Sequence, residues 1–275
     1  MVREKRLATV DVNDFSDELK VAETAAREAG RIIMDLYGKE YRIEEKSKGN
    51  PVTAADLEAN RKIREIIRGR YPDDGWLSEE DKDNTDRLKA SRVWVVDPID
   101  GTKEFIAGVP QFAVSVGLVV GGHPMVGVVY NPAEEKFYRA VKGSGAFLNG
   151  RPIHILSRKQ IDGASLLVSR SEPWRKFQSF EGRCRLERLG SIAYRLAQVA
   201  GGEADATLTF RSLREWDVCG GVLIVEEAGG VVLDGEGRRL VFNRPDTLYR
   251  GVVASNEILA RTLQEMLAKI LSDRR

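Results

Sequence analysis

The chain has 275 residues, of which 42% are hydrophobic and 31% are charged, a composition typical of a globular enzyme and too apolar for a disordered chain. It carries 43 basic and 42 acidic residues, for a net charge of +1, which excludes a general attraction to nucleic acid or to anionic membranes. With only two cysteines and two histidines, the sequence argues against a disulfide framework, a histidine-rich zinc site and a Ser-His-Asp triad.

The N-terminal segment is charged and lacks the apolar stretch of a signal peptide. The longest apolar segment, residues 112–120, is far shorter than the roughly 20 residues that span a bilayer. We therefore expect a cytoplasmic protein that binds neither membranes nor a nucleic-acid polymer. Both His123 and His154 are expected in loops.

Two helices are predicted before any strand. Apolar residues at helical spacing predict a helix over residues 16–37, and a second helix is predicted over residues 53–67. Thr53 and Asp56 have the spacing of an N-terminal capping pair, with Asp in place of the usual Glu or Gln.

A mostly antiparallel sheet is expected next. A short apolar strand at residues 93–96 stops at Asp97. Residues 112–120 and 125–130 flank a Gly-Gly-His-Pro turn and predict a hairpin, and the Asn149–Gly150 pair predicts another.

The second half alternates between strands and helices. Strands are predicted at residues 166–169, 231–233 and 252–254, and helices at 192–200, 216–228 and 257–271. This alternation predicts an α/β half, so we divide the chain into an α+β half, residues 1–157, which carries most candidate ligands, and an α/β half, residues 158–275, which carries Asp217 and specificity loops.

The strongest chemical signal is the hexapeptide DPIDGT that begins at Asp97. Asp97, Asp100 and the Ile99 carbonyl supply hard oxygen ligands of the kind that Mg²⁺ prefers. Gly101 permits close backbone approach, and Thr102 adds a hydroxyl and an N–H, which are parts of an anion-binding turn. Taken alone, the hexapeptide is equally well explained as an Asp-Pro turn with an Asx cap.

Three further acids are candidates only in combination. Glu79 belongs to a run of three acids, which by itself indicates a solvated surface. Asp56 and Asp217 each fall in the first turn of a predicted helix, where a carboxylate caps the helix or opposes its dipole.

Four segments together resemble the inositol monophosphatase superfamily in order and spacing. They are GNPVTAAD at 49–56, LSEE at 77–80, DPIDGT at 97–102, and WD at 216–217 followed by EAGG at 227–230. The resemblance runs from about residue 17 to residue 270. It implies a layered αβαβα sandwich of the inositol monophosphatase and fructose-1,6-bisphosphatase type, an α/β (α+β) fold that is generally dimeric, so a homodimer is expected.

The resemblance also implies a Mg²⁺ site with two or three ions. Glu79, Asp97 and the Ile99 carbonyl would bind one ion, and Asp97, Asp100 and Asp217 a second. Such a cluster of acids repels itself by something on the order of 10 kcal/mol unless protons or metal ions neutralise it. We therefore expect Mg²⁺-dependent hydrolysis of a small phosphorylated metabolite by direct attack of water.

Further roles follow from the same resemblance. Asp56 would help to hold a weaker third ion or its water, and Thr102 would orient the attacking water with Glu79 or Asp56. Gly101 and Thr102 would hold the phosphate, and Asp217 would also contact the substrate. Inhibition by Li⁺ is implied as well.

The sequence TKEF at 102–105 resembles the 3′(2′),5′-bisphosphate nucleotidases, so the first expectation is hydrolysis of 3′-phosphoadenosine 5′-phosphate. Lys103 would then meet the second phosphate, although a solvated lysine explains it equally well. The chain departs from the nucleotidases at GSI, 190–192, where they commonly have Gly-Ser-Ser, and at Thr209, where they often have Arg.

Two alternatives stay open. Arg211 and Arg214 are near Thr209 in sequence and are either replacements for the missing arginine or loop charges. An inositol monophosphatase or a sugar (bis)phosphatase would use the same metal site, and a non-catalytic ligand-binding member is the third interpretation.

Overall fold

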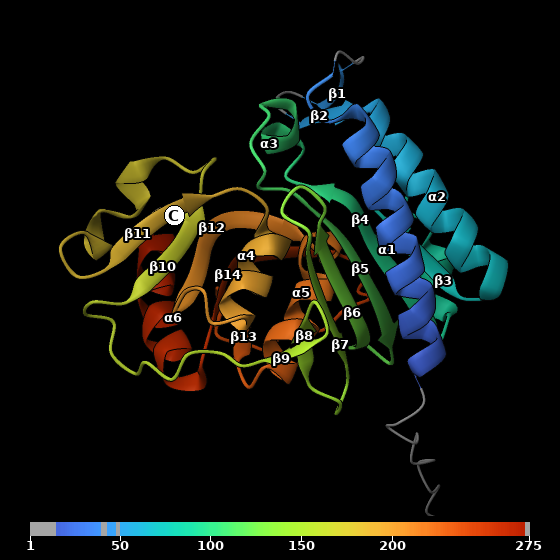
Figure 1. Ribbon diagram of the computed structural model, residues 1–275. Coiled ribbons are helices and arrows are strands. Elements are labelled where there is room, and N and C mark those ends of the chain that lie inside the picture. The colour runs from blue at the N-terminus through green and yellow to red at the C-terminus, as the bar shows by residue number, and fades with distance from the viewer. Residues whose placement is uncertain (1–14, 40–42, 48–49, 273–275) are drawn as a thin grey trace, which may run out of the picture.

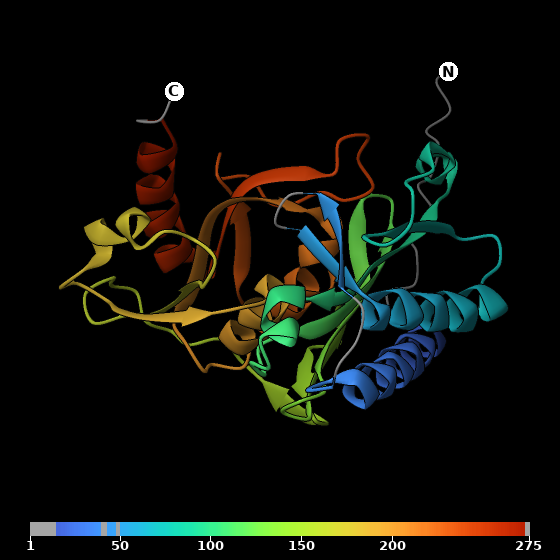
Figure 2. The ribbon, with the colours of Figure 1, turned by 90° about the horizontal axis from the view of Figure 1, so that it is seen from above.

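The computed structural model describes residues 15–39, 43–47 and 50–272. In this part of the chain the elements form five layers, helix–sheet–helix–sheet–helix (Figures 1 and 2). The predicted αβαβα sandwich is therefore confirmed. The α-helices are α1 (Ser16–Leu36), α2 (Ala54–Arg70), α3 (Thr102–Ile106), α4 (Ile192–Ala200), α5 (Glu215–Glu227) and α6 (Glu257–Ser272).

Helices α1 and α2 cover the outer face of the first sheet, α4 and α5 lie between the two sheets, and α6 covers the far face of the second sheet (Figure 1). Buried alanines at Ala22, Ala26 and Ala29 allow α1 to lie close to its neighbours. At the start of α2, Thr53 and Asp56 form the predicted capping box. Both predicted N-terminal helices are confirmed.

The first sheet has seven strands in the order β3-β4-β5-β6-β7-β8-β9. Its strands are β3 (Gly75–Ser78), β4 (Arg92–Asp100), β5 (Ala113–Val120), β6 (His123–Asn131), β7 (Lys136–Val141), β8 (Ala146–Leu148) and β9 (Arg151–Ile153). All neighbours are antiparallel except β3 and β4, which are parallel. The prediction of a mostly antiparallel sheet is confirmed, but β3 and β7 were not predicted.

The prediction that the strand stops at Asp97 is wrong, because β4 continues to Asp100 through a β-bulge. Asp97 pairs with Ser115 and Asp100 with Ala113, so β4 advances by three residues where β5 advances by two. In a regular strand, side chains three positions apart point to opposite faces. The extra residue of the bulge changes this alternation and redirects the chain at the site.

Both predicted hairpins are present. At the β8–β9 turn, Asn149 and Gly150 have φ angles of 48° and 79°, as a two-residue turn of this kind requires. The β5–β6 turn brings one correction, because His123 is the first residue of β6 and not a loop residue. His123 pairs with Val120, so the ladder extends up to the Gly121–Gly122 turn. His154 lies in a loop, as predicted.

The second sheet has five strands in the order β11-β10-β12-β14-β13. Its strands are β10 (Ser165–Ser169), β11 (Arg185–Leu189), β12 (Ala206–Arg214), β13 (Val231–Asp234) and β14 (Leu248–Ser255). The sheet is mixed, with β10 parallel to both of its neighbours. The three predicted strands are confirmed, whereas β11 and β12 were not predicted. Smaller elements are β1 (Ile43–Ser47), β2 (Asn50–Thr53) and the 3₁₀ turns Thr85–Lys89, Trp174–Lys176 and Gln178–Phe180.

Helix α5 of the second half packs directly on strands β5 and β6 of the first sheet. Glycines allow this close approach. A Cβ atom added at Gly117 would lie 2.5 Å from the Cys219 sulfur, and one added at Gly127 would lie 2.5 Å from the Gly220 carbonyl oxygen. Helix α5 also contacts strands β12, β13 and β14 of the second sheet, so it packs against both sheets. The division of the chain at residue 157 stays a prediction.

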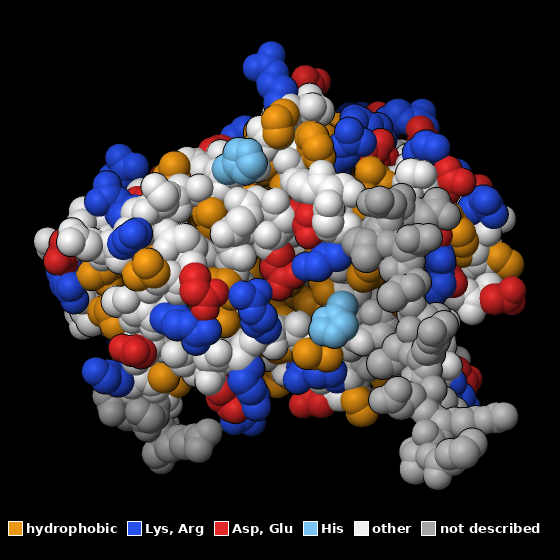
Figure 3. All heavy atoms as spheres, turned by 90° about the horizontal axis from the view of Figure 1, so that it is seen from below, with side chains coloured by type: hydrophobic (Ala, Val, Ile, Leu, Met, Phe, Trp, Pro, Cys, Tyr) orange, Lys and Arg blue, Asp and Glu red, His pale blue; other side chains and the backbone are white. Residues whose placement is uncertain are grey.

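No helix in the described ranges is both long enough and apolar enough to cross a membrane. On the face shown in Figure 3, basic and acidic side chains are interspersed. This mixture agrees with the nearly balanced charge of the sequence.

Candidate active site

Two of the predicted ligands lie on neighbouring strands of the first sheet. The N–H of Glu79, just beyond β3, donates to the Val96 carbonyl of β4 at 3.2 Å, so Glu79 lies beside Asp97. Asp97 is buried, and its Oδ1 accepts from the N–H of Ile99 at 3.0 Å. Its Oδ2 is buried and has no hydrogen-bond partner among the residues that the structure describes. An unpartnered buried carboxylate oxygen is costly, and a cation would relieve that cost.

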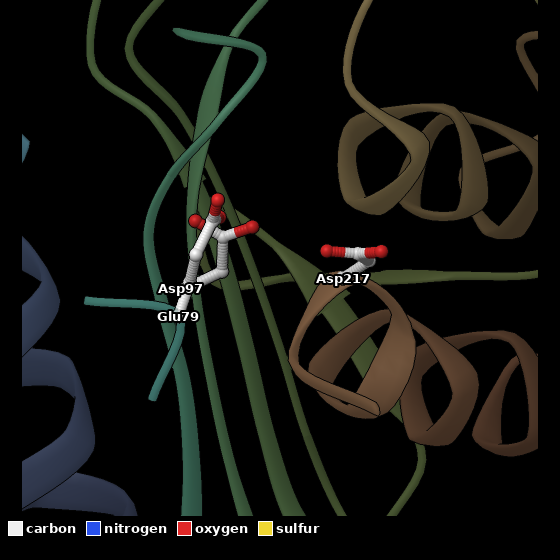
Figure 4. A group of neighbouring side chains, drawn as sticks. All are labelled: Glu79, Asp97 and Asp217. Carbon is white, nitrogen blue, oxygen red and sulfur yellow. The ribbon is translucent and has the colours of Figure 1, made fainter. Parts of the chain in front are cut away.

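Asp217 reaches the same point from the second half of the chain. It lies in the first turn of α5, where its Oδ2 accepts from the N–H of Arg214 at 2.7 Å. Figure 4 shows Glu79 and Asp97 on the sheet side and Asp217 at the facing end of α5. One oxygen from each of these three carboxylates lies within 4.8 Å of the others.

Asp100 faces the same pocket but is anchored to the start of α4. Its Oδ2 accepts from the Ser191 hydroxyl at 2.7 Å and from the N–H of Ala193 at 2.6 Å. Ser191, whose φ is 39°, also caps α4 by accepting from the N–H of Tyr194 at 3.0 Å. These bonds engage one oxygen of Asp100 and fix the orientation of the other.

Asp56 and Thr102 are hydrogen-bonded to each other near the carboxylate cluster. The Thr102 hydroxyl oxygen lies 3.0 Å from Asp56 Oδ1 and 3.1 Å from the Ile99 carbonyl oxygen, so its single proton is donated to one of them at a time. Asp56 Oδ2 accepts from both the N–H and the hydroxyl of Thr53. Burial raises the pKa of Asp56, and the bonds from Thr53 and Thr102 oppose that rise.

The remaining predicted phosphate ligands lie in the turn before α3 and in α3 itself. Gly101 has a φ of 98°, and a Cβ atom there would lie 2.9 Å from the Gln111 carbonyl oxygen, so only glycine fits without strain. Lys103 follows in α3, where it is exposed and lines the pocket.

The carboxylates perturb one another strongly. Burial raises the pKa of Asp97 and of Asp217 well above the ordinary value, and repulsion from Glu79 and Asp100 raises both further. Burial also raises the pKa of Asp100 to about 6, opposed by its bonds to α4. Hard oxygen donors, mutual repulsion and the unpartnered Asp97 oxygen together fit a divalent cation such as Mg²⁺.

The comparisons with known proteins agree with this geometry. The model of the inositol monophosphatase family matches residues 14–275. The chain belongs to this family. An inositol monophosphatase of Mesembryanthemum crystallinum is 32% identical over 271 residues, covering 94% of this chain and 97% of the relative. A histidinol-phosphatase of Chlorobaculum parvum is 32% identical over 259 residues, covering 90% and 96%.

The same family supplies solved structures of this fold. The structure of the Thermotoga maritima IMPase superposes with a TM-score of 0.84 at 30% identity, covering 94% of this chain and 99% of that one. The phosphatase family and its fold are therefore shown, while the relatives differ in the substrates that they are named for.

The pocket that Glu79, Asp97, Asp100 and Asp217 line has a volume of about 550 Å³ and is lined by residues of both sheets. It is lined by two charged residues that the sequence analysis did not assign to the site, Glu104 and Arg195, and also by Arg211 and Arg214, which lie in β12 and not in a loop. Glu104 and Arg195 are both buried. Sequence patterns alone gave no sign of this, because an acid in a short turn and an arginine on a helix are ordinarily solvated.

Proposed function

We propose that this protein is a Mg²⁺-dependent phosphomonoesterase that hydrolyses a small phosphorylated metabolite. The observation that carries the proposal is the buried, unpartnered Oδ2 of Asp97, located where Glu79 and Asp217 also present carboxylate oxygens. The phosphatase names of the relatives support the reaction class.

Bound Mg²⁺ would lower the pKa of a water molecule and stabilise negative charge on the phosphoryl and leaving-group oxygens. The chain contributes oxygen ligands from both halves of the fold to one pocket. The proposed ligands are Glu79, Asp97, the Ile99 carbonyl, Asp100 and Asp217.

The Thr102–Asp56 pair would orient the attacking water. When the Thr102 hydroxyl donates its proton to Asp56, its oxygen is able to accept a hydrogen bond from water. Glu79 would accept a second bond from the same water, and Asp56 would help to hold a weaker third ion. Gly101 and Thr102 would hold the phosphate in a turn whose close packing on the Gln111 carbonyl requires glycine at position 101.

For the substrate, we propose a phosphate monoester that carries a second phosphate, with 3′-phosphoadenosine 5′-phosphate as the first candidate. Lys103, Arg211 and Arg214 line the pocket and add positive charge beyond the carboxylate cluster. A second anionic group on the substrate would be stabilised by that charge.

A second candidate, an inositol or sugar phosphate, is favoured by Thr209. Threonine is neutral, so Thr209 does not provide the charge that nucleotidases often have at this position. Its side chain is buried, and its hydroxyl donates to Glu172 Oε2 at 2.7 Å. The names of the relatives favour the same alternative.

A substrate panel separates these candidates. Phosphate release with Mg²⁺ would be measured on 3′-phosphoadenosine 5′-phosphate, inositol 1-phosphate and fructose 1,6-bisphosphate, with Asp97→Asn as the control for contaminating phosphatases. We expect the highest kcat/KM on the bisphosphate nucleotide. A higher value on inositol 1-phosphate would select the second candidate, and no turnover of any substrate would indicate a non-catalytic member.

We also propose that the protein is a cytoplasmic homodimer and that Li⁺ inhibits it. Light scattering of the purified protein tests the homodimer, and Li⁺ titration of the turnover assay tests the inhibition.

A further inference from the structure

The pocket contains a buried cation whose hydrogen-bonding capacity is mostly unused. Arg195 of α4 is 3% exposed and lines the pocket wall. Its Nη1 donates to the Thr207 hydroxyl at 3.1 Å and to the Leu208 carbonyl at 3.3 Å. Its Nε is buried without a hydrogen-bond partner among the described residues.

A second buried arginine shows what full satisfaction requires. Arg87 is also 3% exposed, yet it bonds both oxygens of Asp83 at 2.7 and 2.8 Å. It also donates to Asn243 Oδ1 at 2.8 Å and to the Arg244 carbonyl at 3.0 Å. Burying a guanidinium is costly unless it is paired in this way. By this measure Arg195 lacks an anionic partner, and the pocket that it lines is the space from which one would arrive.

Arg195 is attracted by Asp100, Glu172 and Glu104 but forms no ion pair with any carboxylate of the described residues. Burial lowers its pKa to about 10, so the guanidinium is charged at neutral pH. Glu172 forms an ion pair with Lys176 instead, with Lys176 Nζ 3.0 Å from Glu172 Oε1. The positive charge of Arg195 is therefore not neutralised by a direct contact.

The surroundings of Arg195 fit an anion. Ser169, at the end of β10, lines the same pocket, and its hydroxyl has no hydrogen bond within the described ranges. The exposed Arg211 lines the pocket from β12 and adds a second guanidinium. Guanidinium forks and a hydroxyl are the groups that recognise phosphate or carboxylate.

We propose that Arg195 is a substrate-binding residue that donates to an anionic group of the substrate other than the phosphate being hydrolysed. This inference rests on the proposed function for its substrate class, but binding of the anion is testable without turnover. It assigns the part of the pocket beside Ser169 and Arg211 to a second phosphate or a carboxylate.

The binding test uses inorganic phosphate as the probe in the presence of EDTA, where the unneutralised carboxylate cluster repels anions. Thermal unfolding would be compared for the wild-type protein, Arg195→Met, Arg195→Lys and the control Arg183→Met, which changes an exposed arginine paired with Asp162. We expect phosphate to raise the Tm of the wild-type protein and of the control, less that of Arg195→Lys, and not that of Arg195→Met. An equal rise in Arg195→Met, or no rise in the wild-type protein, would overturn the inference. If Arg195→Met does not fold, an undiminished rise in Arg195→Lys overturns it instead.

Kinetics separate binding from a structural role. With Mg²⁺, Arg195→Met should raise KM for fructose 1,6-bisphosphate about tenfold more than KM for 4-nitrophenyl phosphate, which has no second anionic group. Equal changes for the two substrates would show that Arg195 acts only through the structure and would overturn the inference. If the wild-type protein hydrolyses neither substrate while the loss of the phosphate effect is seen, the proposed function fails and the anion site stands.

Discussion

The hydroxyl oxygen of Thr102 lies 3.0 Å from Oδ1 of Asp56, which links the first turn of α3 to the first turn of α2. Asp56 is held in turn by the capping bonds from Thr53. A cap that stabilises α2 thus also fixes the acceptor for the Thr102 proton, so helix stability and site geometry depend on the same carboxylate.

Removing the Thr102 hydroxyl should reduce turnover without removing the metal site. Thr102→Ala should lower kcat by about 100-fold or more, the usual effect of losing a group that positions a proton. Thr102→Ser keeps the hydroxyl and should retain most activity. Steady-state kinetics and Mg²⁺ titration of the Tm would be measured together. A loss of the Mg²⁺ effect in Thr102→Ala would contradict this assignment.

Asp97→Asn should lower turnover by about 100-fold or more, because it removes a negative ligand from the centre of the cluster. Asn keeps the oxygen that accepts from the N–H of Ile99, so the bulge of β4 should persist. Without metal, the free energy of unfolding should be unchanged or higher, because a buried charge and its repulsion are removed. Urea unfolding in EDTA tests this, with the exposed Asp162→Asn as control. A marked destabilisation would show that Asp97 has another partner.

Magnesium should stabilise the folded protein. A ligand that binds only the native state at about 100 times its Kd adds about 2.7 kcal/mol to the free energy of unfolding. The measurement is a thermal melt in EDTA and in millimolar MgCl₂. The effect should be much smaller in Asp97→Asn. An unchanged Tm of the wild-type protein would argue strongly against a metal site at this cluster.

The stability of the metal-free protein should fall as pH rises. The pKa of Asp100 is raised to about 6 and those of Asp97 and Asp217 are raised well above the ordinary value, in each case chiefly by burial. The native state therefore binds more protons than the unfolded chain, so the free energy of unfolding decreases with pH. The decrease should begin near the ordinary aspartate pKa of about 3.9 and continue beyond pH 6.

Urea unfolding in EDTA at several pH values between 5 and 8 would measure this slope, and saturating Mg²⁺ should largely abolish it. A metal-free protein that becomes more stable from pH 5 to pH 8 would contradict the raised pKa values.

The stereochemistry at phosphorus tests the absence of a covalent intermediate. The only cysteine beside Asp217 is Cys219, which is buried and whose thiol pKa is raised by that burial, so it is a poor nucleophile. Direct attack of water should invert the configuration of a chirally labelled phosphate ester. Net retention would indicate two displacements and a covalent intermediate.

Much of the fold was predictable because its signals are local. The helical spacing of apolar residues and the Thr53–Asp56 cap predicted the first two helices, and Asn149–Gly150 predicted its turn. By contrast, β3 and β12 were missed because pairing of strands far apart in sequence, and not local pattern, defines them.

The candidate site was predictable where residues form a motif and not where they are isolated. The DPIDGT segment led to Asp97 and Asp100, which do face one pocket. Arg195 was missed because its significance comes from burial and an unsatisfied nitrogen, and neither quantity is visible in a sequence. The β-bulge was missed for a similar reason, since it depends on the register between β4 and β5.

The glycines beneath α5 have a consequence for the whole carboxylate cluster. Asp217 lies on a helix that is held close to the sheet at two glycines. A Cβ atom at Gly220 would lie 2.8 Å from the Val128 carbonyl oxygen, and one at Gly127 would lie 2.5 Å from the Gly220 carbonyl oxygen. The distance between Asp97 and Asp217 therefore depends on a close backbone-to-backbone approach that only glycine allows. An alanine at either glycine would push α5 away from the sheet and increase that distance, although neither glycine lines the pocket.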